Sequence, residues 1–362
     1  MARFAILTSH LKTGDAIGND VLGMYRALKK QGHETRMYAE NWDFEDQEIW
    51  PVGQIRDFLK KPDDVFIYHH SIGWDAGIAL INDLPCQKVI KYHNVTPPEF
   101  FAGVSKWHEE RCIEGQRQLS AIVSAGCDLY LSASAYNMRD FQALGVSEAK
   151  NFVVPPFHQL DQLQSIPADM KVLETYRDGK ANILSVSRVA PHKNQAALIE
   201  AFAIYHHDYN RHSRLIIVGR EEEPFRSYSA HLRDLIKFLT LEDAVVFSGE
   251  LADDSLKAFY LLGNVFMFAS SHEGFSVPLV EAMALKVPIV SYDAAAIPET
   301  VGNAGVILEN RDPALMAEAV NFLVEDEATN VALGVSGRQR YEECFTNTRI
   351  ETRFLRALEH LN

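Results

Sequence analysis

The chain has 362 residues, of which 47% are hydrophobic and 10% aromatic, and its formal net charge is −14. These values indicate a folded globular protein that is too long for one hydrophobic core and suits two domains of ordinary size. The negative charge disfavours nucleic acid as a partner, and no apolar run approaches the roughly 18 residues of a membrane-spanning helix. The four cysteines form no Cys-x-x-Cys pair, which argues against structural zinc and disulfides and is typical of a reducing cytosol.

The N-terminus reads as the first strand of the fold, because its apolar part is too short for a signal peptide. We therefore expect a cytoplasmic protein. Lys29-Lys30 and Lys60-Lys61 are the densest basic points of the first half. They leave open a peripheral contact with the anionic inner face of the plasma membrane, although solvated helix ends would also explain them.

Strand-like runs alternate with helical runs throughout the first half. The helix expected over 19–31 carries apolar residues at helical spacing, namely Val21, Leu22, Tyr25 and Leu28. The strands of this half are expected over 4–8, 33–38, 64–69, 88–92, 129–133 and 151–154.

The same alternation continues in the second half, with strands expected over 182–187, 214–218, 244–247, 265–269, 288–292 and 305–308. It predicts an α/β protein with two doubly wound parallel sheets, each in a Rossmann-like domain. Pro155-Pro156 ends the first series, and the residues to about 180 read as a connector. We place the domains at 1–160 and 161–344, and the C-terminal run 348–361 is predicted to be helical.

The most informative segment joins the strand at 265–269 to a helix, with Pro278 in the first turn. Glu273 lies at the strand's C-terminal end, and Glu281, eight positions later, is expected about two turns into the helix. A helix N-terminus behind a parallel strand offers free N–H groups and the positive end of a dipole, which suits a diphosphate. The two carboxylates can hold ribose and sugar hydroxyls. The segment is therefore suited to a nucleotide joined to a sugar.

This run, Glu-Gly-Phe-Ser-x-Pro-x-x-Glu-Ala-Met-Ala, resembles the signature of the retaining glycosyltransferases of family GT4, also called glycosyl transferases group 1. The resemblance is strongest from about 180 to 310. It implies the GT-B fold, with two Rossmann-like domains facing a cleft and the final helix, about 345–362, packing back on the first domain. It also implies that Glu281 binds the ribose of the donor and Glu273 its sugar.

Two cations lie where the family binds the donor diphosphate. Arg188 and Lys193 are five positions apart in a loop that leads into a helix, so they can neutralise a departing diphosphate. Asn194 stands where the family often has glycine, which affects the expected shape of the loop but not its charge. The sequence contains no Asp-x-Asp motif. We therefore predict a metal-independent reaction with no cofactor and no metal ligand.

In open parallel sheets, ligands lie beyond the C-terminal ends of the strands, and several histidines follow the expected strands of the first half. His93 matches a family histidine that reaches the transferred sugar from the first domain. Ser9-His10 and His69-His70 could be structural or could line the acceptor pocket. Gly14 lies in a loop that resembles the family's first glycine-containing loop, although an ordinary turn explains it equally well.

The resemblance also implies which backbone segments line the nucleotide. Glu299 receives only a supporting role, because Ala295-Ala296 departs from the glycine-rich form of many relatives. The expected nucleotide-binding residues are Glu281, Gly14, Gly219, Phe247, Gly249, Gly274, Phe275, Ser276 and Val277.

Together these observations predict a retaining hexosyltransferase that uses a nucleotide-sugar donor, with a UDP-sugar favoured over GDP-mannose. The expected acceptor is a saccharide or lipid-linked saccharide, in the synthesis of a bacterial surface polysaccharide. Three alternatives stay open: a sugar-nucleotide epimerase of the same fold, a non-catalytic sugar-nucleotide-binding module, and a hydrolase that uses Glu273 and Glu281. The last is disfavoured because one acid lies at a strand end and the other in a helix.

Overall fold

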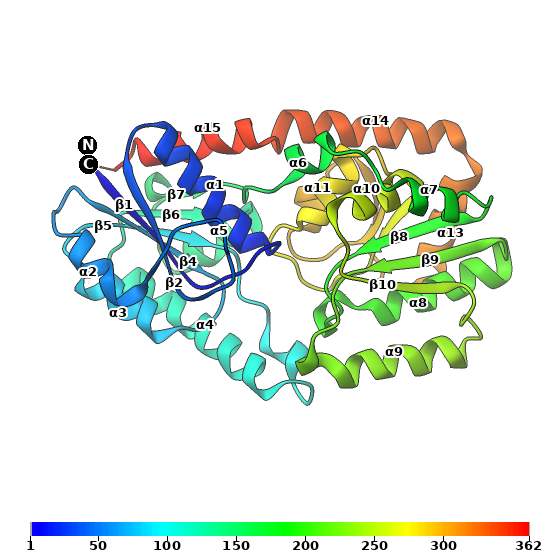
Figure 1. The fold of residues 1–362 in the computed structure, drawn as a ribbon. Helices are drawn as coiled ribbons and strands as arrows, with labels where there is room; N and C mark the ends of the chain where they lie inside the picture. Colours follow the sequence, from blue (N-terminus) through cyan, green and yellow to red (C-terminus); the bar gives the residue numbers. More distant parts are fainter. Residues whose placement is uncertain (1, 362) are drawn as a thin grey trace. The chain divides into compact units, whose positions relative to one another are not determined.

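The computed structural model describes residues 2–361, which divide into two compact units (Figure 1). Unit 1 comprises residues 2–99, 107–159 and 346–361, and unit 2 comprises residues 100–106 and 160–345. Each unit contains one parallel sheet with helices between its strands, as the α/β alternation predicts.

The sheet of unit 1 has seven strands in the order β3-β2-β1-β4-β5-β6-β7, and every neighbouring pair is parallel. Its central strands are almost wholly apolar and buried, because helices cover both faces of such a sheet. The strands are β1 (Arg3–Leu11), β2 (Glu34–Trp42), β3 (Ile49–Pro51), β4 (Val65–His70), β5 (Gln87–Tyr92), β6 (Leu129–Ser132) and β7 (Asn151–Val153).

The helices of unit 1 are α1 (Ala16–Lys30), α2 (Ile55–Phe58), α3 (Asp75–Asp83), α4 (Lys106–Ser124), α5 (Ala135–Ala143) and α15 (Asn347–Leu358). The C-terminal helix α15 belongs to this unit. Ile350, Phe354 and Ala357 recur at helical spacing, and all three are buried in the same core as Ile6 of β1 and Met24 of α1. This apolar stripe explains why a helix from the far end of the chain completes the first unit.

The sheet of unit 2 has six parallel strands in the order β10-β9-β8-β11-β12-β13. They are β8 (Ala181–Val186), β9 (Ser213–Val218), β10 (Val245–Gly249), β11 (Val265–Phe268), β12 (Ile289–Tyr292) and β13 (Gly305–Leu308). The helices are α6 (Leu160–Ser165), α7 (Met170–Tyr176), α8 (Gln195–Ile204), α9 (Arg226–Phe238), α10 (Asp253–Leu262), α11 (Val277–Ala284), α12 (Ile297–Val301), α13 (Pro313–Glu325) and α14 (Glu327–Cys344).

Each sheet has a topological switch point, where the strand order changes direction. In unit 1 it lies between β1 and β4, and in unit 2 between β8 and β11. Ligands of open α/β sheets bind beyond the carboxyl ends of the strands at such a point. The chemistry of this protein is therefore to be sought in the segments that follow these strands.

The segment 100–106 lies in unit 2, although the expected boundaries place it in the first domain. Aromatic packing explains the difference. The ring of Phe101 stacks on that of Phe225 with centroids 5.7 Å apart, and it meets His192 edge-on at the same separation. Burial of this ring outweighs its proximity in sequence to unit 1.

Several strand ends also differ from the expected ones. The strand β3 was not expected, because it has only three residues and ends in a proline, as an edge strand tolerates. Both β1 and β4 run further than predicted, so Ser9-His10 and His69-His70 lie inside strands and not beyond them. Gly249 is likewise the last residue of β10.

Residues 2–361 contain no helix that combines the length and the apolar character needed to cross a membrane.

Candidate functional site

The loops after β8 and β11 hold the expected cations and carboxylates of unit 2. Since the two strands are neighbours at the switch point, their loops lie side by side. Backbone contacts join them: the N–H of Ser271 donates to the carbonyl of His192 over 2.8 Å, and the hydroxyl of Ser270 donates to the same carbonyl over 3.1 Å. The fold therefore brings together groups that are about 80 residues apart in sequence.

Lys193 and Glu273 form a direct ion pair across these loops. The ammonium Nζ lies 2.6 Å from the carboxylate Oε1, and the two side chains are only 16% and 7% exposed. A charge-assisted contact this short and this sheltered is much stronger than a surface salt bridge. The contact fixes one candidate phosphate-binding cation directly beside one candidate sugar-binding carboxylate.

Arg188 is more exposed and pairs with Glu222, which follows β9. The distance from the guanidinium to Oε1 of Glu222 is 3.4 Å, and Arg220 contacts the same oxygen over 3.0 Å. Burial alone would raise the pKa of Glu222, but Arg188 and Arg220 outweigh it and lower the pKa below its usual value. Sequence reasoning missed Glu222, which lies in the loop between β9 and α9.

Glu281 lies in the second turn of α11, because the helix begins at Val277. The sequence predicts a position about two turns into the helix, whereas Glu281 lies about one turn from the start; Pro278 lies in the first turn, as expected. Oε2 of Glu281 accepts a 2.7 Å hydrogen bond from the hydroxyl of Tyr260, a buried residue of α10. Burial raises the pKa of Glu281 to about 7, and the bond from Tyr260 opposes this rise. No feature of the sequence pointed to Tyr260.

The N-terminus of α11 has no side-chain cap, and its geometry is strained. Ser276 occupies the N-cap position with φ 80° and a buried hydroxyl that lacks a hydrogen-bond partner. A non-glycine residue in this backbone region costs on the order of 1–3 kcal/mol and is held only by its surroundings. The hydroxyl of Thr300 supplies part of that support by donating to the carbonyl of Phe275 over 2.9 Å. Uncapped N–H groups at a helix start suit an anion.

The remaining residues expected to line the nucleotide are of different kinds. Phe275 is buried, and its ring packs edge-on against Phe345, so only its backbone can face a ligand. Gly219 is required by packing, because a Cβ there would lie 1.9 Å from the carbonyl oxygen of Ser187. Gly249 and Gly14 have positive φ with open space around them. The side chain of Phe247 packs partly buried against the core of unit 2.

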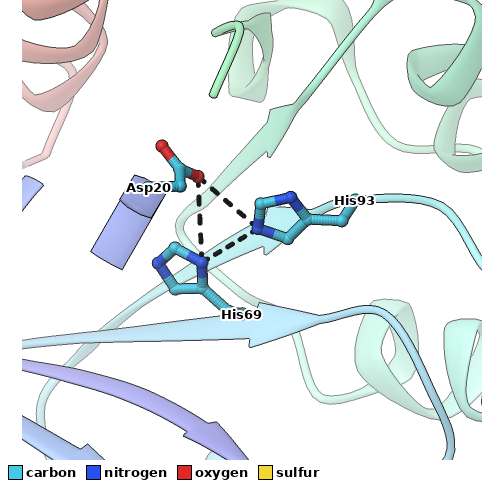
Figure 2. Close-up of side chains that lie close together, drawn as sticks. All are labelled: Asp20, His69 and His93. Carbon is cyan, nitrogen blue, oxygen red and sulfur yellow. Dashed lines mark hydrogen bonds and ion pairs between the residues drawn. The ribbon is translucent and has the colours of Figure 1, made fainter. Parts of the chain in front are cut away.

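A second cluster lies at the switch point of unit 1 (Figure 2). Asp20 projects from α1, His69 from β4 and His93 from the residue directly after β5. Nδ1 of His69 lies 2.9 Å from Nε2 of His93, and Oδ2 of Asp20 lies 3.8 Å and 3.5 Å from these two atoms. Nζ of Lys91 lies 3.6 Å from the same oxygen. His93 thus turns Nε2 inward to buried protein groups.

Burial controls the protonation of this cluster. It lowers the pKa of both His69 and His93 well below the usual value, and Lys91 lowers both further. Burial also raises the pKa of Asp20, against the effect of Lys91 and of the Phe157 N–H, which donates to Oδ1 over 2.9 Å. Both imidazoles are therefore neutral at physiological pH.

The other histidines of the first half lie apart from this cluster. His70 is fully buried and contacts the carbonyl of Gly115 through Nε2 over 2.9 Å, and burial lowers its pKa to about 4. These are the features of a structural histidine. His10 is exposed on β1, with Nδ1 3.2 Å from the hydroxyl of Ser9.

Comparisons with known proteins agree with this geometry. Residues 170–340 match the family model described as Glycosyl transferases group 1. Among curated proteins, the GDP-mannose-dependent alpha-(1-6)-phosphatidylinositol monomannoside mannosyltransferase of Mycobacterium tuberculosis is 28% identical over 228 residues, 60% of this chain and 58% of that protein. O-antigen chain mannosyltransferase B of Escherichia coli is 28% identical over 52% of this chain and 50% of that protein. The matched parts thus span about half the length of these relatives.

Solved structures extend the likeness to the whole chain. The Anabaena protein HepE, in complex with UDP and glucose, superposes with a TM-score of 0.79 at 16% identity and 100% coverage of both chains. Sucrose-phosphate synthase of Thermosynechococcus elongatus gives a TM-score of 0.78 at 18% identity, covering 100% of this chain and 99% of that one. At these identities the likeness shows the fold, which is GT-B. Residues 170–340 thus carry the similarity to the glycosyl transferases group 1 family.

Proposed function

We propose that the protein transfers a hexose from a nucleotide-sugar to a saccharide or lipid-linked saccharide with retention of the anomeric configuration. The main support for this proposal is the arrangement at the switch point of unit 2. The Lys193–Glu273 pair, Arg188 and the uncapped start of α11 all lie on the loops after two neighbouring strands. Few ligands need cations, a helix N-terminus and sugar-binding carboxylates together, and a nucleoside diphosphate sugar is one of them.

Each group has a definite role in this proposal. Arg188 and Lys193 stabilise the charge that develops on the departing diphosphate, together with the N–H groups at the start of α11. Glu273 accepts hydrogen bonds from hydroxyls of the donor sugar, and Glu281 accepts them from the ribose. A carboxylate that Lys193 contacts over 2.6 Å is held in one orientation, so it can bind a neutral sugar without a metal ion.

The identity of the donor and the setting of the reaction rest on relatives. One relative is named as GDP-mannose-dependent, and HepE was solved with UDP and with UDP-glucose. We favour a UDP-sugar, with GDP-mannose second, and an acceptor in surface polysaccharide or glycolipid synthesis on the cytoplasmic side of the membrane. CapM of Staphylococcus aureus, named for capsular polysaccharide biosynthesis, is 32% identical over 45% of this chain and 41% of that protein.

A ligand panel followed by product analysis tests the proposal. Melting temperature is measured with UDP, GDP, UDP-glucose and GDP-mannose, because a ligand that binds the folded state raises it by linkage. The stabilising donor is then incubated with and without saccharide acceptors, and the product linkage is assigned by NMR. Retained configuration in an acceptor-dependent product supports the proposal. An acceptor-independent change at a sugar carbon would indicate an epimerase, and binding without turnover would indicate a binding module.

Two carboxylate variants assign the donor contacts by calorimetry. Glu281→Ala should weaken binding of the bare nucleoside diphosphate, whereas Glu273→Ala should mainly weaken binding of the sugar-bearing donor. Equal losses for both variants with the bare diphosphate would contradict these roles.

A further inference from the structure

The Asp20–His69–His93 cluster of unit 1 has a feature that the proposed transfer does not use: three lone-pair donors from three separate segments converge on one point (Figure 2). Asp20 is 0% and His69 is 2% exposed, and Oδ2 of Asp20 accepts no hydrogen bond, although the Lys91 ammonium lies 3.6 Å away. A buried carboxylate oxygen is rarely left so, because an unsatisfied polar atom in the interior costs on the order of 1–3 kcal/mol. It faces two imidazole nitrogens.

The spacing of the three atoms fits a first-row metal ion. In a tetrahedral zinc site with bonds of about 2.0–2.1 Å, neighbouring donor atoms lie roughly 3.3–3.4 Å apart. The three separations here are 2.9, 3.5 and 3.8 Å. In the plane of the three atoms, the point that is equidistant from them lies about 2.0 Å from each. This distance is close to the length of a zinc–nitrogen bond. Side-chain movements of a few tenths of an ångström would make the triangle regular.

The chemistry of the donor set selects the kind of ion. Two imidazoles and one carboxylate suit Zn²⁺ and its first-row neighbours, whereas Mg²⁺ and Ca²⁺ prefer oxygen ligands alone. The side chain of His93 is 10% exposed, which gives the cluster a path to solvent. We propose that Asp20, His69 and His93 form a binding site for a zinc-like divalent transition metal ion, with the fourth position open to water or another ligand.

Lys91 sets the affinity of this site. Its ammonium lies 3.6 Å from Oδ2 of Asp20 and also donates to the carbonyl oxygen of Val154. It balances the carboxylate when no metal ion is bound, and it repels a dication that binds there. A site with only three protein ligands and a neighbouring cation should therefore bind reversibly, more weakly than a structural zinc site.

Cobalt is the probe, because Co²⁺ takes the geometry of zinc and absorbs visible light when four-coordinate. The chelator-treated full-length protein is titrated with Co²⁺, and we expect one equivalent to give this absorption and Zn²⁺ to abolish it. His69→Gln and His93→Gln should each lose the signal. His206→Gln is the matched control, because His206 and His207 form another close pair of histidine rings, 5.3 Å apart, in unit 2.

The Lys91→Met variant distinguishes a metal site from a buried charge cluster. Removal of the ammonium should tighten cobalt binding by roughly tenfold or more. Circular dichroism of each variant identifies any that fails to fold. Absence of cobalt absorption in both the unmodified protein and folded Lys91→Met would overturn the proposal. So would an absorption that survives His69→Gln or disappears in His206→Gln. None of these readouts depends on transferase activity.

Discussion

Replacement of Glu281 by glutamine tests the electrostatics of the proposed ribose site without any ligand. The pKa of this carboxyl is 4.5 by its ordinary value and about 7 in the folded protein. The folded state therefore binds more protons than the unfolded state between these two values, so this group makes the free energy of unfolding fall as the pH rises from about 4.5 to about 7. Above that range its effect is constant. Glutamine cannot ionise and lacks this penalty.

The pKa difference corresponds to roughly 3 kcal/mol, and because Glu281 keeps some solvent access we expect about 2 kcal/mol. Urea unfolding at pH 5 and pH 8 measures it. Relative to the unmodified protein, Glu281→Gln should gain about 2 kcal/mol of stability on going from pH 5 to pH 8. Glu309→Gln, at an exposed position, is the control for exchanging one carboxylate for an amide. The same stability difference at both pH values would refute the reasoning.

Three further predictions concern the donor site. Arg188→Ala and Lys193→Ala should each lower kcat/KM by about 10²–10³-fold, since each removes a group that stabilises developing charge; the melting temperature should change little for the exposed Arg188 but fall for Lys193, whose loss leaves Glu273 unpaired; near-normal kcat/KM in either would remove that group from the mechanism. Tyr260→Phe should weaken nucleotide binding about tenfold at pH 7 and recover at higher pH, because loss of its hydrogen bond raises the pKa of Glu281; calorimetry at both pH values decides, and a pH-independent loss would count against it. Transfer should persist in excess chelator, because cations of the chain act on the diphosphate; an absolute manganese or magnesium requirement would contradict this.

The alternation of apolar strands with helices was sufficient to predict the fold, because each strand of a parallel sheet is buried on both faces and is visible as a short apolar run. The Glu-Gly-Phe-Ser run of residues 273–284 was enough to locate one binding loop, since its glycine, proline and acids have fixed places around a helix start. The edge strand β3 could not be predicted, because three residues are too few to show an alternation of apolar and polar side chains. The segment 100–106 was misplaced because a single ring, Phe101, decides its packing.

Partners of the site residues could be predicted far less well than the residues themselves. The pairing of Lys193 with Glu273 joins positions in different loops, and it follows from the strand order β8-β11, which no local pattern encodes. The same holds for Asp20, His69 and His93. The absence of cysteine pairs and of Asp-x-Asp led to the expectation of no metal ligand, and the ligands of the proposed site, which come from three separate elements, would have no sequence spacing to recognise.

The ion pairs of unit 2 bear on how a donor would bind. Lys193 and Glu273 are both largely buried, and each would be costly to hold alone, because desolvation of an unpaired charge is unfavourable by several kcal/mol. Pairing holds both side chains in place without a ligand. In the proposed function, a diphosphate adds negative charge beside Lys193, while the sugar offers hydroxyl donors to Glu273. Each of the two charged groups therefore exchanges one partner for another and is never left without one.

A variant that removes either charge leaves its partner uncompensated. The pair should therefore be tested by changing both residues as well as each one. If the contact is purely structural, the double variant Lys193→Met/Glu273→Gln should regain both stability and donor binding; if it positions the donor, both single variants and the double variant should lose binding of the sugar-bearing donor alike.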